Sequence, residues 1–425
     1  MNPTKFLIRT FKDYYTKNAA NLPEVSKFTN REFAFLPWDK SIMLRHMSFE
    51  NIASFSHYLI NSAPKHVYSS GSLYNHPEIP NMEKKGYEGC DLIIDIDVDH
   101  FYTPCKDDHD GWYCKSCFKN GKGMPLACPE CGSLKLKRVS WICEKCLDVA
   151  KKEVLKLLDN FLIPDFGIDQ KSIMIAFSGH RGYHLKVEDK NLRTLSSDAR
   201  REIIDYLTGN NLNFELLGLR ARSGIVYGIS QENIGWAKKL NNEIERLLKQ
   251  SELDIEHFLL NIGFKKNRIR SFLNQKEIFL ERFKNSELND WSMEGFDIDK
   301  WKIFLSGIAK RVGANIDEPV SVDIHRLIRY PGTLHGKTGF KVQELSIGEL
   351  ADFNPLDATT KSKDPIVFQQ QGIDINLKII EEFVPATKIK GITYGPYDQG
   401  DKICVPKHIA VYLLCKEVAE PMSMI

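Results

Sequence analysis

The sequence lacks any apolar run long enough to cross a membrane, which would need about 20 mostly apolar residues. It also lacks the apolar core of a signal peptide, because its first residues, MNPTKFLIRTFKDYY, mix charged with apolar side chains. Internal repeats and low-complexity tracts are absent as well. We therefore expect a soluble intracellular protein with no membrane partner.

The chain has no marked excess of charge of either sign. Its 58 basic and 56 acidic residues leave a formal net charge of +2, so bulk charge neither requires nor excludes a polyanionic partner. Any nucleic-acid site must therefore come from local basic patches. An apolar content of 42% is that of an ordinary globular protein, and 425 residues allow one large domain or two to three smaller ones.

Cysteine is scarce outside one short segment. Three of the ten cysteines stand apart, and the other seven fall within residues 105–146. Such a concentration indicates a local metal-binding device and not a disulfide framework. Together with one histidine, these cysteines form four ligand pairs: Cys105 and His109, Cys114 and Cys117, Cys128 and Cys131, and Cys143 and Cys146.

Eight such ligands suffice for two zinc ions, since structural zinc takes four Cys or His ligands. In a nested grouping, the four middle cysteines bind one ion and the outer pairs bind the other. In a sequential grouping, the first four ligands bind one ion and the last four bind the second. We favour the nested grouping, because the segment with the four middle cysteines resembles a zinc-ribbon knuckle inserted within the site that the outer pairs form. With every position filled by protein, the zinc is expected to be structural.

The stretch DLIIDIDVDHF, residues 91–101, places acids where a buried strand is predicted. Asp95, Asp97 and Asp99 alternate with apolar residues, so they are expected on one face of the strand. Like charges on one face repel each other, and paired carboxylates can hold divalent cations. The alternative is a solvated edge strand, but the apolar residues 92–94 favour a buried central strand.

Two glycine-containing loops carry side chains suited to phosphate oxygens. They are FSGHRGYH, residues 177–184, and RLIRYPGTLHGKTG, residues 326–339. Glycine permits tight turns and close backbone approach, while arginine, histidine and serine bind phosphate. For either loop alone, an ordinary turn with solvated charges is the alternative. Just before the second loop, Asp317 and Asp323 offer a further carboxylate.

The rest of the chain predicts a mixed α/β core with a helical insertion. Residues 196–311 have polar, helix-period sequence, and we interpret them as a helical subdomain. The core then consists of residues 1–195, which include the zinc-binding module of 105–146, and residues 312–425.

Taken in order, these motifs resemble those of the catalytic small subunit of archaeo-eukaryotic DNA primases, the archaeal branch most closely. The resemblance rests on MLRHMSF, LIIDIDVD, the cysteine segment ending CEKCLDVAKKEV, SGHRGYH and IDEPVSVDIHRLIRYPGTLHGKTG. It covers most of the chain and is weakest within 196–311. It implies the primase catalytic core, with template-directed synthesis of short RNA primers, or RNA/DNA primers, on single-stranded DNA for replication by two-metal-ion nucleotidyl transfer.

The resemblance also implies roles for individual residues. Asp95, Asp97 and a third acid would bind two Mg²⁺ or Mn²⁺ ions, and Asp317 matches the third acid better than Asp323. Cys143 and Cys146 would belong to the family's zinc site. The positions that contact the nucleotide in this family correspond to Arg45, Ser178, Arg181, His184, Arg329 and His335.

The same resemblance implies partners and a location. The partners would be a large iron–sulfur subunit forming a heterodimer, a single-stranded DNA template, and NTPs or dNTPs. The location would be cytoplasmic and nucleoid-associated. A repair-type or template-independent polymerase of the same superfamily would carry the same acids and loops. A non-catalytic zinc-ribbon nucleic-acid-binding protein is the alternative from another class.

Overall fold

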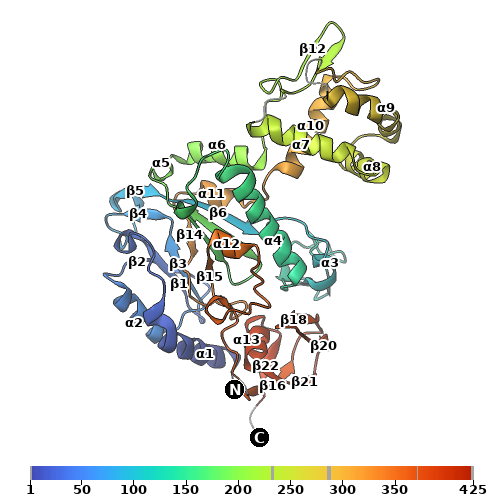
Figure 1. Ribbon diagram of the computed structural model, residues 1–425. Helices are drawn as coiled ribbons and strands as arrows, with labels where there is room; N and C mark the ends of the chain where they lie inside the picture. Colours follow the sequence, from blue (N-terminus) through green and yellow to red (C-terminus); the bar gives the residue numbers. More distant parts are fainter. Residues whose placement is uncertain (1, 231–233, 285–288, 371, 423–425) are drawn as a thin grey trace. The chain divides into compact units, whose positions relative to one another are not determined.

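The computed structural model describes residues 2–230, 234–284, 289–370 and 372–422. The chain forms two compact units (Figure 1), of which the first comprises Met1–Leu155, Ile168–Arg200 and Ile316–Ile425, and the second Lys156–Gly167 and Arg201–Asn315. The second unit therefore takes in a short segment, 156–167, that we assigned to the core. Among the described residues, no helix is both long and apolar enough to span a membrane.

Two four-stranded antiparallel sheets form the framework of the first unit. One has the order β15-β10-β11-β6, built from β6 (Leu92–Asp97), β10 (Ile173–Phe177), β11 (Gly182–Val187) and β15 (Gln343–Leu345). The other has the order β14-β3-β1-β2, built from β1 (Phe33–Leu36), β2 (Leu44–Met47), β3 (His66–Ser70) and β14 (Leu327–Arg329).

The acidic strand β6 differs from our expectation in two ways. It is an edge strand of its sheet, because β11 is the one described strand that pairs with it, although Ile94 and Ile96 are fully buried. It also ends at Asp97, whose carboxylate accepts a hydrogen bond from the Asp99 amide at 2.9 Å and caps a 3₁₀ turn, Val98–His100. Asp95 and Asp97 therefore share a face of the strand, and Asp99 does not.

Helices cover these sheets (Figure 1). The helix α1 (Pro3–Asn18) starts after Asn2, whose side chain accepts a hydrogen bond from the Lys5 amide at 3.2 Å, and it buries Phe11 and Tyr15. The other helices of this unit include α2 (Ile52–Ser62), α4 (Glu144–Leu157), α5 (Lys190–Arg193), α11 (Glu318–Val322), α12 (Ile347–Leu350) and α13 (Lys407–Cys415).

Smaller sheets complete the first unit. The cysteine-rich segment begins with α3 (Lys106–His109) and forms a sheet of β7 (Gly111–Cys114), β8 (Asn120–Lys122) and β9 (Leu136–Val139), with β7 in the middle. The strands β4 (Ser72–Tyr74) and β5 (Tyr87–Cys90) pair with each other. The C-terminal strands are β16 (Asp374–Ile379), β17 (Phe383–Val384), β18 (Thr387–Ile389), β19 (Ile392–Tyr394), β20 (Tyr397–Asp398), β21 (Lys402–Pro406) and β22 (Ala419–Pro421).

The second unit is mostly helical around an aromatic core. Trp301 is fully buried, and its ring centroid lies 5.0 Å from that of Trp291 and 5.0 Å from that of Phe279. Its elements include α6 (Ser197–Thr208), which begins in the first unit, and the hairpin of β12 (Arg220–Arg222) and β13 (Ile225–Tyr227). The remaining helices are α7 (Gly235–Leu248), α8 (Glu252–Asn261), α9 (Lys266–Lys284) and α10 (Ile298–Val312).

We predict that Trp301→Ala destabilises the second unit by about 3–5 kcal/mol, because it removes a large, fully buried aromatic side chain. Urea unfolding followed by far-ultraviolet circular dichroism measures the change. The control is Ile303→Ala on the same helix, since this side chain is 48% exposed and its loss should cost about 1 kcal/mol or less. Equal effects of the two substitutions would contradict this packing.

Candidate active site

A cleft of about 200 Å³ in the first unit collects side chains from both four-stranded sheets. The sheet of β6 and β11 contributes Asp95, Asp97 and His184, and the sheet of β3 and β14 contributes Tyr68 and Arg329. Of the nine residues predicted for catalysis or nucleotide binding, the cleft is lined by Asp95, Asp97, Ser178, His184, Arg329 and His335.

The pairing of β6 with β11 fixes the carboxylates. His184 lies opposite Asp95 in the antiparallel register, with its Nε2 3.5 Å from the Asp95 carboxylate, and Gly182 lies opposite Asp97. A Cβ on Gly182 would stand 2.3 Å from the carbonyl oxygen of Ile96. Glycine is therefore required at this position for β11 to approach the acidic strand.

The two carboxylates lie where their negative charge is poorly stabilised. Burial, with a smaller effect of Asp317, raises the pKa of Asp95 to about 6. Burial and the neighbouring Asp99 raise the pKa of Asp97. Asp95 Oδ1 is also buried without a hydrogen-bond partner among the described residues. A cation at this position would supply the missing partner, so the carboxylates fit a divalent-metal site.

Of the two acids predicted before the second loop, Asp317 and not Asp323 lies beside Asp95, although Asp317 does not line the cleft whereas Asp99 does. The amide of Asp317 donates a hydrogen bond to the carbonyl oxygen of Asp95 at 2.8 Å, and its carboxylate lies 3.2 Å from His100 Nε2. Asp323 is exposed, and its carboxylate accepts a hydrogen bond from the His325 amide at 2.8 Å within a turn. Of these two acids, Asp317 is therefore the one placed to share a cation with Asp95.

The opposite side of the cleft is cationic. Arg329 Nη1 lies 2.7 Å from His66 Nδ1, and the guanidinium stands 5.1 Å from the centre of the Tyr68 ring. Burial lowers the pKa of Arg329, so an anionic partner would offset the poor solvation of its charge. Burial and Arg329 also lower the pKa of His184 to about 3, which leaves that imidazole neutral at physiological pH.

The two glycine loops meet at the cleft. Thr338 Oγ1 donates a hydrogen bond to the carbonyl oxygen of Gly179 at 2.6 Å, and the His180 ring stacks on that of His335 at 5.2 Å. Gly179 has φ +82°, and a Cβ there would approach the His335 Cβ to 2.7 Å. These loops are separate motifs in the sequence, but in the structure they form one surface.

Two predicted nucleotide contacts lie elsewhere. Arg181 is completely buried and pairs with Asp99 and Asp110, so it does not line the cleft. Arg45 does not line the cleft either; its Nε bonds Glu32 at 2.9 Å. Sequence reasoning assigned no role to Tyr68 or Arg326, which do line it. Arg326 lies within the second loop motif, whereas nothing in the sequence around Tyr68 indicated a site.

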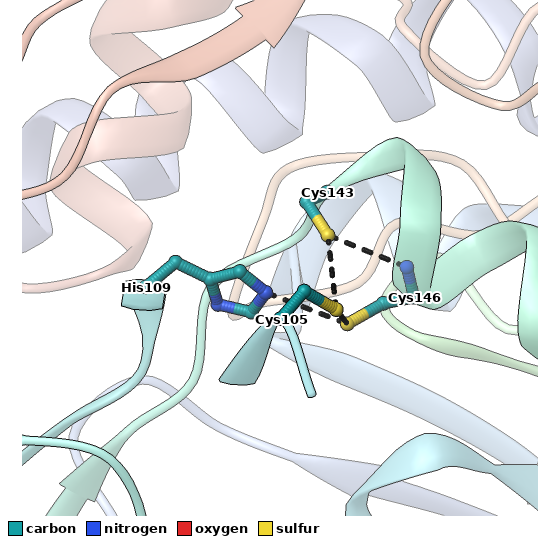
Figure 2. Close-up of side chains that lie close together, drawn as sticks. All are labelled: Cys105, His109, Cys143 and Cys146. Atoms are coloured by element: carbon teal, nitrogen blue, oxygen red, sulfur yellow. Dashed lines mark hydrogen bonds between the residues drawn. The ribbon is translucent and has the colours of Figure 1, made fainter. Parts of the chain in front are cut away.

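The eight potential zinc ligands form two clusters in the nested arrangement, and the sequential one does not occur. The outer cluster consists of Cys105, His109, Cys143 and Cys146 (Figure 2), with Cys105 and His109 at α3 and the other two at the start of α4. The inner cluster consists of Cys114, Cys117, Cys128 and Cys131.

The spacing within both clusters fits a tetrahedral metal. Two sulfurs bound at about 2.3 Å to one zinc lie about 3.8 Å apart. The Sγ atoms of Cys105 and Cys143 are 3.7 Å apart and those of Cys114 and Cys131 are 3.6 Å apart, whereas the Cys105 and Cys146 Sγ atoms are closer, at 3.2 Å. His109 Nε2 points into the outer cluster, 3.5 Å from Cys146 Sγ (Figure 2). Either cluster could hold a metal ion.

Comparison with known proteins identifies the family. The DNA primase small subunit family model matches residues 139–347. Relatives named DNA primase small subunit PriS include that of Methanothrix thermoacetophila, 33% identical over 98% of each chain. That of Methanococcoides burtonii is 31% identical over 98% of each chain. That of Archaeoglobus fulgidus is 32% identical over 97% of this chain and 96% of its own.

The chain belongs to the DNA primase small subunit family. This membership confirms the expectation of a nucleotidyltransferase with a mixed α/β primase fold, and it does not favour the repair-type polymerase or the non-catalytic zinc-ribbon protein. A small subunit also implies a partner subunit.

We predict that Asp95→Asn stabilises the protein at pH 7.5 in buffer without Mg²⁺ or Mn²⁺. As the pH rises from about 4 to 6, the unfolded chain loses the Asp95 proton before the folded chain does, so wild-type stability falls. Because asparagine carries no charge, the variant does not lose this free energy of unfolding, which we expect to amount to about 1–3 kcal/mol at pH 7.5. Thermal unfolding at several pH values measures it.

The difference between Asp95→Asn and the wild type should shrink toward pH 4. The exposed Asp323→Asn is the control and should match the wild type throughout. A difference for Asp95→Asn that does not change with pH would contradict the burial of the Asp95 charge.

Proposed function

We propose that this chain is the catalytic subunit of a DNA primase and that Asp95, Asp97 and Asp317 are its catalytic carboxylates. The observation that carries the proposal is the cleft, in which two half-buried carboxylates on one face of β6 share a cavity with Arg329 and the glycine loops. A cation-loaded nucleoside triphosphate matches this charge pattern, since it presents both positive and negative charge.

Within this cleft the protein's own groups bind and orient the triphosphate. The Ser178 hydroxyl and the neutral His184 and His335 rings offer hydrogen bonds to its oxygens, and Arg329 offers a paired donor whose charge stabilises the transferring phosphoryl group. Arg326 and Lys337, which also line the cleft, add positive charge. When bound by the three carboxylates, Mg²⁺ or Mn²⁺ would lower the pKa of the attacking 3′-hydroxyl and neutralise phosphate charge.

We assign zinc to both cysteine clusters, with a structural role. Thiolate and imidazole ligands with tetrahedral spacing suit zinc better than Mg²⁺ or Mn²⁺. All four positions of each cluster are protein ligands, so no position is open for substrate. The inner cluster stabilises the small β7–β8–β9 sheet, where Trp112, Cys114 and Cys128 form a buried core.

The proposed partners are a large iron–sulfur subunit, a single-stranded DNA template and NTPs or dNTPs, in a cytoplasmic, nucleoid-associated complex. A cleft of about 580 Å³ that includes Asp99, Tyr102 and Lys122 supports a path for the template. Tyr102 is 70% exposed, and aromatic side chains beside basic ones are typical of single-strand binding.

The test is primer synthesis without a pre-existing 3′ end. The protein, with its partner subunit, is given NTPs, Mn²⁺ and single-stranded DNA, and labelled products are resolved by length. The proposal expects short primers from the wild type and none from the double variant Asp95→Ala, Asp97→Ala, with zinc content and fold retained. Extension of a supplied primer without synthesis of a new one would favour the repair-type polymerase. Absence of any incorporation by the wild type would refute a catalytic role.

We predict that Asp317→Asn lowers the rate of primer synthesis about 10²-fold or more, whereas Asp323→Asn changes it about twofold or less. Asp317 supplies a carboxylate beside Asp95, and loss of a catalytic charge costs several kcal/mol. The asparagine at 323 keeps an oxygen to accept the His325 amide hydrogen bond. Rates at saturating nucleotide and metal measure both variants, and the reverse ranking would transfer the role to Asp323.

A further inference from the structure

Asp110 connects the outer cysteine cluster with the interior of the first unit. Its side chain is completely buried, and its carboxylate accepts hydrogen bonds from His109 Nδ1 at 2.8 Å and from the Trp141 amide at 2.9 Å. A carboxylate only accepts at this position, so the proton of His109 lies on Nδ1 and its Nε2 is free to face the cluster. Asp110 thereby sets the orientation of a cluster ligand.

Arg181 continues this connection toward the catalytic carboxylates. Its Nη1 donates to both oxygens of Asp110, at 2.8 and 2.7 Å, and to the carbonyl oxygen of Trp141 at 3.0 Å. Its Nη2 donates to the carboxylate of Asp99. The amide of Asp99 in turn donates to the carboxylate of Asp97 at 2.9 Å. An unbroken series of hydrogen bonds therefore runs from the ligand His109 to Asp97.

A second contact holds the same turn. Lys106 lies between the cluster ligands Cys105 and His109 in sequence, and its Nζ donates to the carbonyl oxygen of Phe101 at 2.6 Å and also to that of Val98. These carbonyls flank the 3₁₀ turn that carries Asp99. The segment that bears the outer cluster thus holds the acidic turn at two points.

We propose that Arg181 and Asp110 are positioning residues that fix the Asp97–Asp99 turn against the outer cluster, and that Arg181 does not bind the triphosphate. The proposal deepens the proposed function, because it rests on Asp97 being a catalytic carboxylate and on zinc in the outer cluster. It also replaces the nucleotide contact that the sequence motif suggested for Arg181.

The surroundings of Arg181 argue against a phosphate contact. Both of its terminal nitrogens are occupied by carboxylates, its side chain is 0% exposed, and it does not line the cleft. A triphosphate could reach these nitrogens only by displacing Asp99, whose side chain is 31% exposed, or Asp110, whose displacement would leave a completely buried carboxylate unpaired. The planar fork of arginine can bridge two carboxylates in fixed geometry, whereas the single ammonium of lysine cannot.

The first measurement is the release of zinc from the folded holoprotein to a coloured chelator. We expect two phases, one for each cluster, and Cys128→Ser identifies the inner-cluster phase by removing it. Asp110→Asn should speed release from the outer cluster about 10–100-fold, because loss of a ligating histidine's carboxylate partner weakens metal affinity by about that factor. Arg181→Lys should speed the same phase about tenfold. The inner-cluster phase is the internal control and should not change.

The second measurement separates positioning from phosphate binding by kinetics. Arg181→Lys should lower kcat for primer synthesis about tenfold while leaving KM for nucleotide within about twofold. Arg329→Lys, at a position that lines the cleft, is the matched comparison. It should raise KM about tenfold, because lysine loses the paired donor, and it should release zinc like the wild type.

The proposal is overturned if Arg181→Lys behaves like Arg329→Lys, with a raised KM and unchanged zinc release. It is also overturned if Asp110→Asn leaves the outer-cluster phase unchanged. Zinc release needs neither template nor turnover, so it can succeed or fail regardless of whether the wild type makes primers. The experiments can therefore distinguish a failure of the positioning role of Arg181 and Asp110 from a failure of the proposed primase function.

Discussion

The site depends above all on the close pairing of β6 with β11, since this contact holds two like-charged, half-buried side chains on one face of the sheet. Gly182 makes the pairing possible, because any Cβ there would meet the Ile96 carbonyl at 2.3 Å. Burial raises the pKa of both Asp95 and Asp97. The fold thus holds carboxylates whose negative charge a bound cation would stabilise, so the pair is suited to a metal site.

The second four-stranded sheet supplies the complementary half. Arg329 on β14 brings a half-buried positive charge to the same cleft, and the joined glycine loops bring His335 and Ser178. Acids on one sheet and cations on the other leave between them a cavity that suits a metal-bound polyanion better than either ion alone. Gly179 is essential to this arrangement, because its loop contacts His335 more closely than a side chain would allow.

Sequence reasoning succeeded where a property is local in the chain. The alternation of Asp95 and Asp97 and the short spacing of the cysteine pairs required only neighbouring residues. It failed where long-range pairing decides: the edge position of β6, the end of that strand before Asp99, and the placement of Tyr68 in the cleft. Such features arise from contacts between distant segments, which one sequence does not display.

Arg181 shows why a motif can identify a chemical group without identifying its partner. A guanidinium beside a glycine turn suits phosphate and carboxylate equally, because both present paired oxygens. The partner is decided by Asp110, which lies 71 residues earlier in the chain. Because the cysteine segment begins directly after β6, the outer cluster lies where it can hold the end of that strand. The position of the cysteine segment directly after β6 therefore allows the acidic turn to be held by β11 on one side and by the outer cluster on the other.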